Sequence, residues 1–402
     1  MAKKPDLIIV GAGGIHGSAA AARLSKEFNV VGFEQFERGT DKGSSGGWER
    51  MSRLATGEGM NYAVGARFSQ EKILDLQAAT GRELLRITGG IDSSPPSRDP
   101  VNDPSWVQTV KGIRRELGLP FEETNGHDLK KRKENFNLNL PDDTEIVIES
   151  DMGIISTAAR EVNLSIAEAN GAQFYFNTRV AGLDYEHRTA VIMEDGQRID
   201  ASKIVCIGGN WLNDLLDEKN KLPIINEQRF LAYYPILENH GAVPYVYYTK
   251  EHIIYGMPSW KGGLFKTGDS NHLREVISPG AGLTPPGDAD YAVTDRIPRE
   301  LMTGIGGQAV DFMKGRYSIT PRGDFIIDLH PDNPDIVLES ACSGHGFKHF
   351  PFVAEIVHEL ATGEPSGFEL SRFRIRSNDR AALQQQISLI QGKKKDRLPL
   401  RL

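Results

Sequence analysis

The chain has 402 residues, of which 39% are hydrophobic and 25% charged, and its formal net charge is -7. This balance carries no broad basic excess that would favour nucleic acid, and no apolar run approaches the roughly 18 residues of a membrane span. We therefore expect a soluble, cytoplasmic protein without a nucleic-acid or membrane partner. The length exceeds the roughly 250–300 residues at which one core usually divides, which predicts two domains. Cys206 and Cys342 are too few for a metal cluster, so no metal site is expected.

The first predicted elements are a strand, a glycine-rich turn and a helix. The apolar run 7–10 is followed by GAGGIHG at residues 11–17 and by an alanine-rich segment, 18–24. Glycines let the backbone turn sharply and approach a pyrophosphate, while the helix start supplies N–H groups and positive potential for that anion. The usual spacing, Gly-x-Gly-x-x-Gly, places His16 in the last position unless one residue is inserted before Gly17.

A second strand at 30–33 ends at Glu34, about 20 residues after the turn. A carboxylate there can accept hydrogen bonds from both hydroxyls of an adenosine ribose. Together, the strand, turn, helix and acidic strand end predict a dinucleotide site for FAD or NAD. The alternative is a glycine-rich turn that binds no ligand.

The next part of the chain continues with alternating elements. The pattern over 62–87 is typical of a long helix, and the stretch 93–103, rich in proline, serine and aspartate, indicates a surface connection. A second α/β portion begins after the apolar run 146–148. Its expected elements are a helix at 156–170, strands at 174–176, 191–193 and 203–207, and a helix from the turn at Gly208-Gly209 through Leu216.

Residues 223–315 are rich in aromatic and β-branched runs, which predict a mostly antiparallel sheet. Strands at 325–328 and 336–338 and a helix at 352–360 follow. We expect an α/β protein in which a Rossmann-like domain is assembled from discontinuous segments, with an antiparallel-sheet domain inserted between them. The expected bounds are 1–90, 151–222 and 317–402 for the nucleotide-binding domain, and 91–150 and 223–316 for the substrate domain. This interrupted plan favours FAD over NAD.

Specific residues add a family resemblance that runs almost end to end. The strongest element is SGHGFK at 343–348, preceded by the strand FIID at 325–328. Further motifs agree in order: Gly43-Ser44, Arg50 and Arg53, GEG at 57–59, 149–153, 208–211, YGMPS at 255–259 and KTG at 266–268. On these residues the chain resembles the sarcosine oxidase branch of the D-amino-acid-oxidase-type flavoproteins. That branch includes N-methyltryptophan oxidase, pipecolate-type oxidases and fructosyl amino acid oxidases.

The resemblance implies roles for four residues in catalysis. Arg53 and Lys348 would clamp a substrate carboxylate over the flavin, the former through a planar fork of donors and the latter as a point charge. Lys266 is similar to a lysine that reaches the flavin through water and stabilises superoxide as it forms from O2. Tyr255 resembles a tyrosine that lines the substrate cavity.

Three of these residues also have structural interpretations. Arg53 could form a surface ion pair with Glu49 or Glu58. Lys266 could be a solvated residue at a strand end, and Tyr255 could belong to the core.

The resemblance also implies which residues bind FAD. Gly344 and Gly346 would let the backbone approach the flavin pyrimidine. His345 would help there or only pack, and Arg50 would lie near the flavin or serve the structure. The full set is Gly11, Gly13, Gly14, Ile15, His16, Glu34, Gly43, Ser44, Arg50, Val180, Gly208, Trp211, Gly344, His345, Gly346, Phe347 and Lys348.

The chain departs from the family pattern at several positions. Gly315 stands where many members carry the cysteine that attaches FAD, so we expect FAD to be bound tightly but non-covalently. Ser45 and Gly46 replace a pair of histidines. Trp48 and Glu49 enter a region in which members with small substrates carry small or polar residues. These changes indicate a pocket altered for a bulkier or cationic N-substituted amino acid.

The activity implied by the resemblance is oxidation of the C–N bond of a secondary or cyclic α-amino acid to an imine, with O2 reduced to H2O2. One alternative is a dehydrogenase of the same fold that passes electrons to a carrier, and another is a flavin-binding redox regulator without turnover. The expected partners are a small amino acid that carries a carboxylate, and O2. We expect a monomer or small homo-oligomer. The C-terminal residues 400–402 resemble a peroxisomal ending only faintly.

Overall fold

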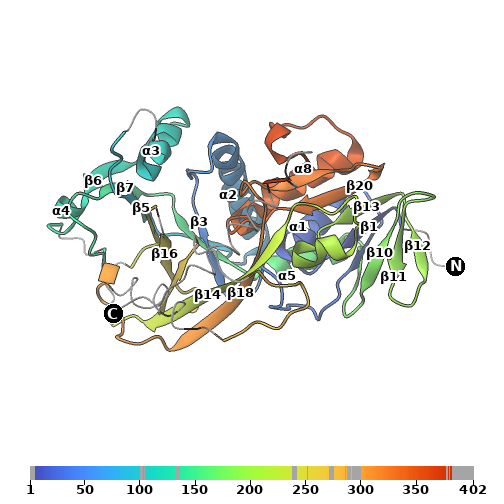
Figure 1. The fold of residues 1–402 in the computed structure, drawn as a ribbon, viewed down its shortest axis with the longest axis horizontal. Coiled ribbons are helices and arrows are strands. Elements are labelled where there is room, and N and C mark those ends of the chain that lie inside the picture. Colours follow the sequence, from blue (N-terminus) through green and yellow to red (C-terminus); the bar gives the residue numbers. More distant parts are fainter. Residues whose placement is uncertain are drawn as a thin grey trace.

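A computed structural model describes residues 5–99, 103, 105–132, 136–237, 242–250, 252–270, 276–285, 287, 291, 300–376, 379 and 381–382. The C-terminal residues 400–402 therefore lie outside the described part. Within it, one large sheet contains β1, β13 and β20 and a second contains β5, β7 and β16, toward opposite ends of the longest axis (Figure 1). None of the described helices is long and apolar enough to cross a membrane.

The first large sheet has six strands in the order β19-β20-β13-β1-β2-β9. These are β1 (Leu7–Val10), β2 (Val30–Phe33), β9 (Gln173–Tyr175), β13 (Lys203–Cys206), β19 (Ile326–His330) and β20 (Asn333–Ser340). All neighbours pair in parallel except β19, which is antiparallel to β20. All residues of β1 are buried, as expected for a parallel strand covered on both faces.

Helices cover one face of this sheet. α1 (Ile15–Leu24) packs against α5 (Ala159–Ala169) and α8 (Phe350–Thr362), and α2 (Met60–Thr80) packs against α8. Leu7 and Ile9 of β1 belong to the core cluster on this side. On the opposite side Ile8 and Val10 share a core with a three-stranded sheet of β10 (Val180–Asp184), β11 (Ala190–Met193) and β12 (Arg198–Asp200).

The second large sheet has eight strands in the order β18-β14-β17-β16-β15-β5-β7-β6. They are β5 (Gly90–Ser94), β6 (Glu122–Asn125), β7 (Glu145–Glu149), β14 (Ile225–Pro235), β15 (Tyr245–Tyr248), β16 (Ile253–Pro258), β17 (Leu264–Asp269) and β18 (Asp311–Ile319). Neighbours pair antiparallel except β15 and β5, which are parallel. The prediction of a mostly antiparallel sheet is confirmed.

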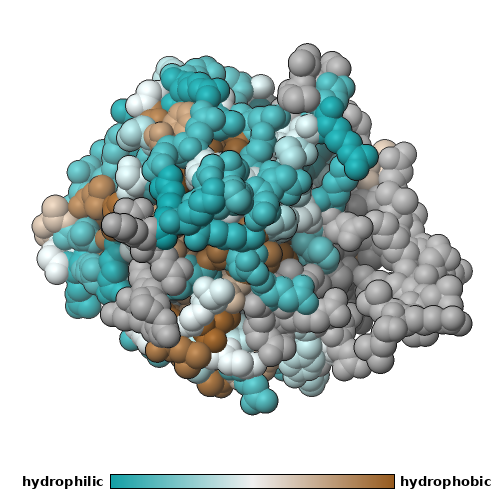
Figure 2. Space-filling view, turned by 90° about the vertical axis from the view of Figure 1, so that its left-hand side faces the viewer, coloured by the Kyte–Doolittle hydropathy of each residue, from teal (hydrophilic) through white to brown (hydrophobic). Residues whose placement is uncertain are grey.

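Smaller elements complete the described structure. β3 (Glu49–Ser52), β8 (Gly153–Ser156) and β4 (Leu85–Ile87) form a three-stranded sheet. α3 (Trp106–Glu116) packs on β5 and β7. The remaining helices are α4 (Gly126–Leu129) and the 3-10 helices η1 (Gly209–Asp214), η3 (Phe347–His349) and η4 (Ser371–Phe373). On the side that lies at the left of Figure 1, most of the described surface is hydrophilic, with smaller apolar areas (Figure 2).

Three local predictions differ from the structure. The helix expected at 62–87 ends at Thr80, because Gly81 takes the left-handed conformation at φ 65° and β4 follows. The expected surface connection at 93–103 begins later, since Ser93 and Ser94 are buried in β5. The helix expected through Leu216 is instead the short 3-10 helix η1, which ends at Asp214.

The strands divide between the two large sheets by segment. Those of the six-stranded sheet come from residues 7–33, 173–206 and 326–340, and those of the eight-stranded sheet come from 90–149 and 225–319. β18 therefore runs past the expected boundary at 316/317. The division into two domains remains a prediction.

Candidate functional site

A cavity of about 620 Å³ is lined by residues from both large sheets. This volume is within the range of roughly 300–1,000 Å³ typical of ligand sites. Every residue that the sequence predicted for cofactor binding or catalysis lines this cavity. The structure thus brings together residues from opposite ends of the chain.

The glycine turn after β1 is tightly packed. Gly11 has a φ of +90°, and a Cβ there would lie 2.1 Å from the carbonyl oxygen of Ile207. A Cβ on Gly17 would lie 2.1 Å from the carbonyl oxygen of Gly11. Gly17, and not His16, therefore makes the close contact between helix and strand that the third glycine of this motif provides.

His16 has a different task, because it joins α1 to the loop after β20. Its Nδ1 lies 2.9 Å from Glu339 Oε1, and its Nε2 lies 3.1 Å from the carbonyl oxygen of Gly346. Burial disfavours the charged ring, but the carboxylate of Glu339 outweighs this and raises the pKa of His16. The side chain fixes the glycine turn against the SGHGFK loop.

Glu34 holds a fixed position at the end of β2. Its Oε2 accepts a hydrogen bond from the Gly13 N–H at 3.1 Å, and its Oε1 accepts one from the Phe36 N–H at 3.1 Å. Burial raises its pKa. Phe36 also packs edge-on against Trp211, with ring centroids 5.0 Å apart. These contacts place the acidic strand end and the predicted Trp211 in the same part of the cavity.

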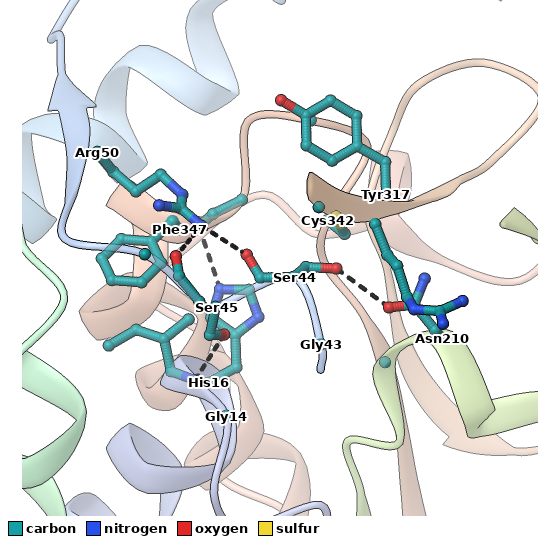
Figure 3. A pocket seen from close by; sticks show the side chains of 18 of the residues that line it. Gly14, His16, Gly43, Ser44, Ser45, Arg50, Asn210, Tyr317, Cys342 and Phe347 are labelled. Atoms are coloured by element: carbon teal, nitrogen blue, oxygen red, sulfur yellow. Dashed lines mark hydrogen bonds between the residues drawn. The ribbon is translucent and has the colours of Figure 1, made fainter. Parts of the chain in front are cut away.

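The segment 43–50 is ordered around Arg50. The guanidinium of Arg50 donates to the carbonyl oxygens of Ser44, Gly46 and Glu49 at 2.7 to 2.8 Å and lies over the ring of Phe347. Figure 3 shows Arg50 beside this segment, with Ser44 facing Asn210. The Ser45 hydroxyl accepts a hydrogen bond from the Ile15 N–H at 3.1 Å, at the N-terminus of α1. Arg50 therefore stabilises the conformation of the segment 43–50 at the cavity wall.

The SGHGFK loop approaches the cavity closely with its backbone. Gly344 has a φ of +80°, and a Cβ on Gly346 would lie 1.6 Å from the carbonyl oxygen of Ala341. His345 stacks on Phe325, with ring centroids 4.8 Å apart, and burial lowers its pKa to about 4, so its ring is neutral. The Lys348 ammonium donates to the carbonyl oxygen of His345 at 3.0 Å. Burial lowers the pKa of Lys348 to about 8.

Arg53 is buried and is not a surface residue. Its Nη1 lies 2.6 Å from Oδ1 of Asp92, which is fully buried, and its Nη2 lies 3.5 Å from the Tyr248 hydroxyl. The interpretation of Arg53 as a surface ion pair with Glu49 or Glu58 is therefore wrong, because its partner is Asp92 in β5.

Lys266 lies inside β17 and is 1% exposed. Its ammonium contacts Glu49 twice, at 2.9 Å from Oε1 and at 2.7 Å from the carbonyl oxygen. The interpretation as a solvated lysine at a strand end is wrong. Burial lowers the pKa of Lys266 to about 8.

Glu49 is itself held by three further donors. They are the Tyr233 hydroxyl at 3.0 Å, the Ser259 hydroxyl at 3.1 Å and the Trp260 N–H at 2.9 Å. The ion pair with Lys266 is therefore fixed from both sides. Glu49 does not offer its carboxylate to the cavity, so the expected binding of a cationic substrate has no support from this residue.

Tyr255 and Gly315 lie where β16 and β18 face the cavity. Tyr255 is partly exposed and lines the cavity near Tyr317, so it is not simply a core residue. A Cβ on Gly315 would meet only a methionine methyl, at 3.9 Å, which leaves that position open. Cys342 is half-buried and lines the cavity.

Sequence reasoning missed three carboxylates that position site residues. Glu339 binds His16, Asp92 binds Arg53, and Glu49 binds Lys266. Glu49 was noted for its place in a substituted segment, but nothing in the sequence indicated its partner. The described residues contain no group of three His, Cys, Asp or Glu side chains that could hold a metal ion.

The geometry of the cavity fits a dinucleotide with its ADP moiety at the glycine turn and its ring system farther along the cavity, toward the eight-stranded sheet. The close-packed glycines, the N-terminus of α1 at the cavity and the fixed carboxylate of Glu34 fit an ADP moiety. The backbone-lined SGHGFK loop and the open Gly315 leave room for a ring system farther along. The fold and site therefore define a dinucleotide-dependent oxidoreductase of the flavoprotein class.

Comparison with known proteins identifies the family. The model of the FAD dependent oxidoreductase family matches residues 6–360, and the chain belongs to this family. It is 27% identical over 395 residues to monomeric sarcosine oxidase from Arthrobacter sp. (strain TE1826), covering 95% of this chain and 98% of the relative. It is 27% identical over 385 residues to N-methyl-L-tryptophan oxidase from Yersinia pestis (strain Pestoides F), covering 92% and 98%.

Solved structures show the same fold. NikD, an unusual amino acid oxidase, has a TM-score of 0.80 at 20% identity and covers 93% of this chain and 98% of its own. Glycine oxidase from Geobacillus kaustophilus has a TM-score of 0.75 at 17% identity, with 93% and 99% covered. The predicted family, mixed α/β fold and FAD-dependent oxidoreductase class are confirmed.

Proposed function

We propose that the protein oxidises the C–N bond of an N-substituted or cyclic α-amino acid to an imine and passes the electrons to O2, which forms H2O2. The observation that carries this proposal is the pair of buried cations, Arg53 and Lys348, on the wall of a cavity that fits FAD. The relatives, an oxidase of sarcosine and an oxidase of N-methyl-L-tryptophan, support the substrate class.

The protein's own residues would bind and orient the substrate. When bound, FAD supplies a hydride acceptor for the carbon next to nitrogen. The Lys348 ammonium and the remaining N–H groups of the Arg53 guanidinium would bind the carboxylate and fix the reacting C–H bond. Tyr255, which lines the cavity together with Tyr317, would form one wall of the substrate space. The glycine turn, Glu34, Trp211 and the SGHGFK loop would hold FAD.

A substrate panel tests this function directly. The purified protein is mixed anaerobically with N-alkyl amino acids, prolines and glycated amino acids, and flavin absorbance is followed. Bleaching by at least one class is expected, and the reactive class identifies the substrate. If the flavin is never bleached by any member of the panel, the proposed substrate class is wrong.

We propose that FAD is bound non-covalently, because Gly315 carries no thiol. Acid precipitation of the purified protein should leave all yellow colour in the supernatant. Colour that stays with the precipitated polypeptide would contradict this prediction. A colourless purified protein that takes up no FAD would instead contradict the assignment of the cofactor.

A second candidate is a dehydrogenase that passes electrons to a carrier. The observation that favours it is the ion pair of Lys266 with Glu49, because a neutralised ammonium stabilises a developing superoxide anion less than a free one. Peroxide formation under air during turnover distinguishes the two candidates.

A further inference from the structure

A row of buried charged side chains lies beside the cavity. Asp92 belongs to β5 and Glu149 ends the neighbouring strand β7, while Arg114 comes from α3, which packs on both strands (Figure 1). In the register of β5 and β7, Asp92 pairs with Val147 and Gly90 pairs with Glu149. Asp92 and Glu149 are therefore diagonal neighbours on one face of the sheet.

Each carboxyl of this pair has one firm partner and one free oxygen. Asp92 Oδ1 binds Arg53 at 2.6 Å, and Glu149 Oε2 binds Arg114 at 2.9 Å. The other oxygens, Asp92 Oδ2 and Glu149 Oε1, are buried and receive no hydrogen bond from the described groups. Glu149 and Asp92 nevertheless lie within hydrogen-bonding reach of each other.

An excess of one negative charge remains around the row unless one carboxyl is protonated. Arg114 binds Asp151 at 2.6 Å in addition to Glu149, and Glu58 interacts with Arg53 and Lys348. Three cations thus face four carboxyls: Arg53, Arg114 and Lys348 against Asp92, Glu149, Asp151 and Glu58. Asp92 and Glu149 are fully buried, and an uncompensated charge there would be costly. A single proton between the two carboxyls removes the excess charge and supplies the donor that their free oxygens lack.

We propose that Glu149 carries a proton that it shares with Asp92, and that this pair positions the guanidinium of Arg53 at the substrate end of the cavity. Asp92 is the anionic member, because its contact with Arg53 is the shorter of the two and because Arg114 divides its donors between Glu149 and Asp151. Burial and the neighbouring Asp92 both raise the pKa of Glu149, in agreement with this assignment. The effect on the substrate rests on the proposed function, whereas the shared proton does not.

This arrangement fixes the orientation in which Arg53 can bind a substrate carboxylate. Because Asp92 occupies one edge of the guanidinium, Arg53 presents its remaining N–H groups in one orientation. Asp92 and Glu149 are positioning residues, since they act through Arg53.

Two amide substitutions that keep the shape of each side chain give opposite expected results. Asp92→Asn replaces the anion that holds Arg53 by a neutral amide, and it should weaken the binding of carboxylate inhibitors roughly tenfold or more, because the hydrogen bond that fixes the guanidinium is no longer one between two charged groups. Glu149→Gln keeps a neutral donor to Asp92, so inhibitor affinity should stay within about twofold of the parent. Affinity is measured from the change in flavin absorbance on titration.

Glu149→Leu serves as the companion variant, because it has the same neutral charge as glutamine but no donor. Glu149→Leu should lower the affinity for the carboxylate inhibitor by about as much as Asp92→Asn does. If Glu149→Gln loses as much affinity as Asp92→Asn, or if both changes are silent, the proposed positioning is wrong.

Infrared spectroscopy of the holoprotein tests the proton separately. Near neutral pH the parent should show the C=O stretching band of a buried carboxylic acid, and this band should be absent from Glu149→Gln. A parent without the band would overturn the shared proton. If the parent binds no carboxylate inhibitor, the proposed function fails, yet the infrared result still decides the proton. If Asp92→Asn does not fold, the infrared result likewise decides the proton, and the comparison of Glu149→Gln with Glu149→Leu tests the positioning.

Discussion

Replacement of Lys348 by methionine should weaken the binding of carboxylate inhibitors by roughly thirtyfold or more while FAD stays bound. The reason is the loss of a buried cation that would face the inhibitor anion, and truncating one partner of such a pair costs about 2–5 kcal/mol. Methionine keeps most of the length and apolar volume of the side chain, so the loop should keep its packing. The measurement is titration with an inhibitor, followed by flavin absorbance, together with the flavin content of the variant.

The pH dependence of inhibitor binding provides a second readout for Lys348. Burial lowers the pKa of Lys348 to about 8, so its ammonium is charged below that pH and becomes neutral above it. Inhibitor affinity should therefore fall as pH rises through about 8, and this fall should disappear in Lys348→Met. Unchanged affinity in Lys348→Met would remove Lys348 from the proposed carboxylate site.

Replacement of Lys266 by methionine should slow reoxidation of the reduced protein by O2 by roughly a hundredfold, while anaerobic reduction by substrate changes much less. Removing one preorganised charge that stabilises a developing anion typically has an effect of about this size. Stopped-flow absorbance separates the two half-reactions. Equal slowing of both would contradict the proposed role of Lys266 toward oxygen.

Two further variants make the Lys266 experiment specific. Lys266→Met leaves the Glu49 carboxylate buried without its cation, so the double variant Glu49→Gln, Lys266→Met controls for that cost. Lys261→Met is the matched surface control, because Lys261 lies over the Trp48 ring and is exposed. Neither half-reaction should change in this control.

Glu49→Gln alone distinguishes the two proposed electron acceptors. The change leaves Lys266 without its counter-charge, and because Glu49 raises the pKa of this lysine, the rates are compared at a pH low enough to keep the ammonium charged. If Glu49 restrains the reaction with O2, reoxidation of the variant at that pH should be faster than that of the parent. Such a result would favour the carrier-dependent dehydrogenase as the natural activity. An unchanged rate would remove the argument for that second candidate.

The sequence by itself was sufficient for the family, the fold class and the main segments that line the cavity. Each of the segments that were recognised is a short stretch of consecutive residues: the glycine turn, the strand end at Glu34 and the SGHGFK loop. Their chemistry depends on local backbone geometry, which the spacing of glycines indicates. Element ends were less certain. The helix predicted to reach residue 87 stops at Thr80 because one glycine can leave the helical conformation at no steric cost.

The tertiary structure alone decided how the basic residues of the site are paired. Arg53 meets Asp92 from 39 positions away, and Lys266 meets Glu49 from 217 positions away. No periodicity or spacing can indicate such partners, because strand pairing brings them together only after the chain has folded. Because these side chains are buried, each pairing strongly affects the stability of the charges, since a charge removed from water must be compensated by a neighbour. The sequence therefore showed which residues reach the cavity, and the packing of distant strands decided which of their charges are already neutralised.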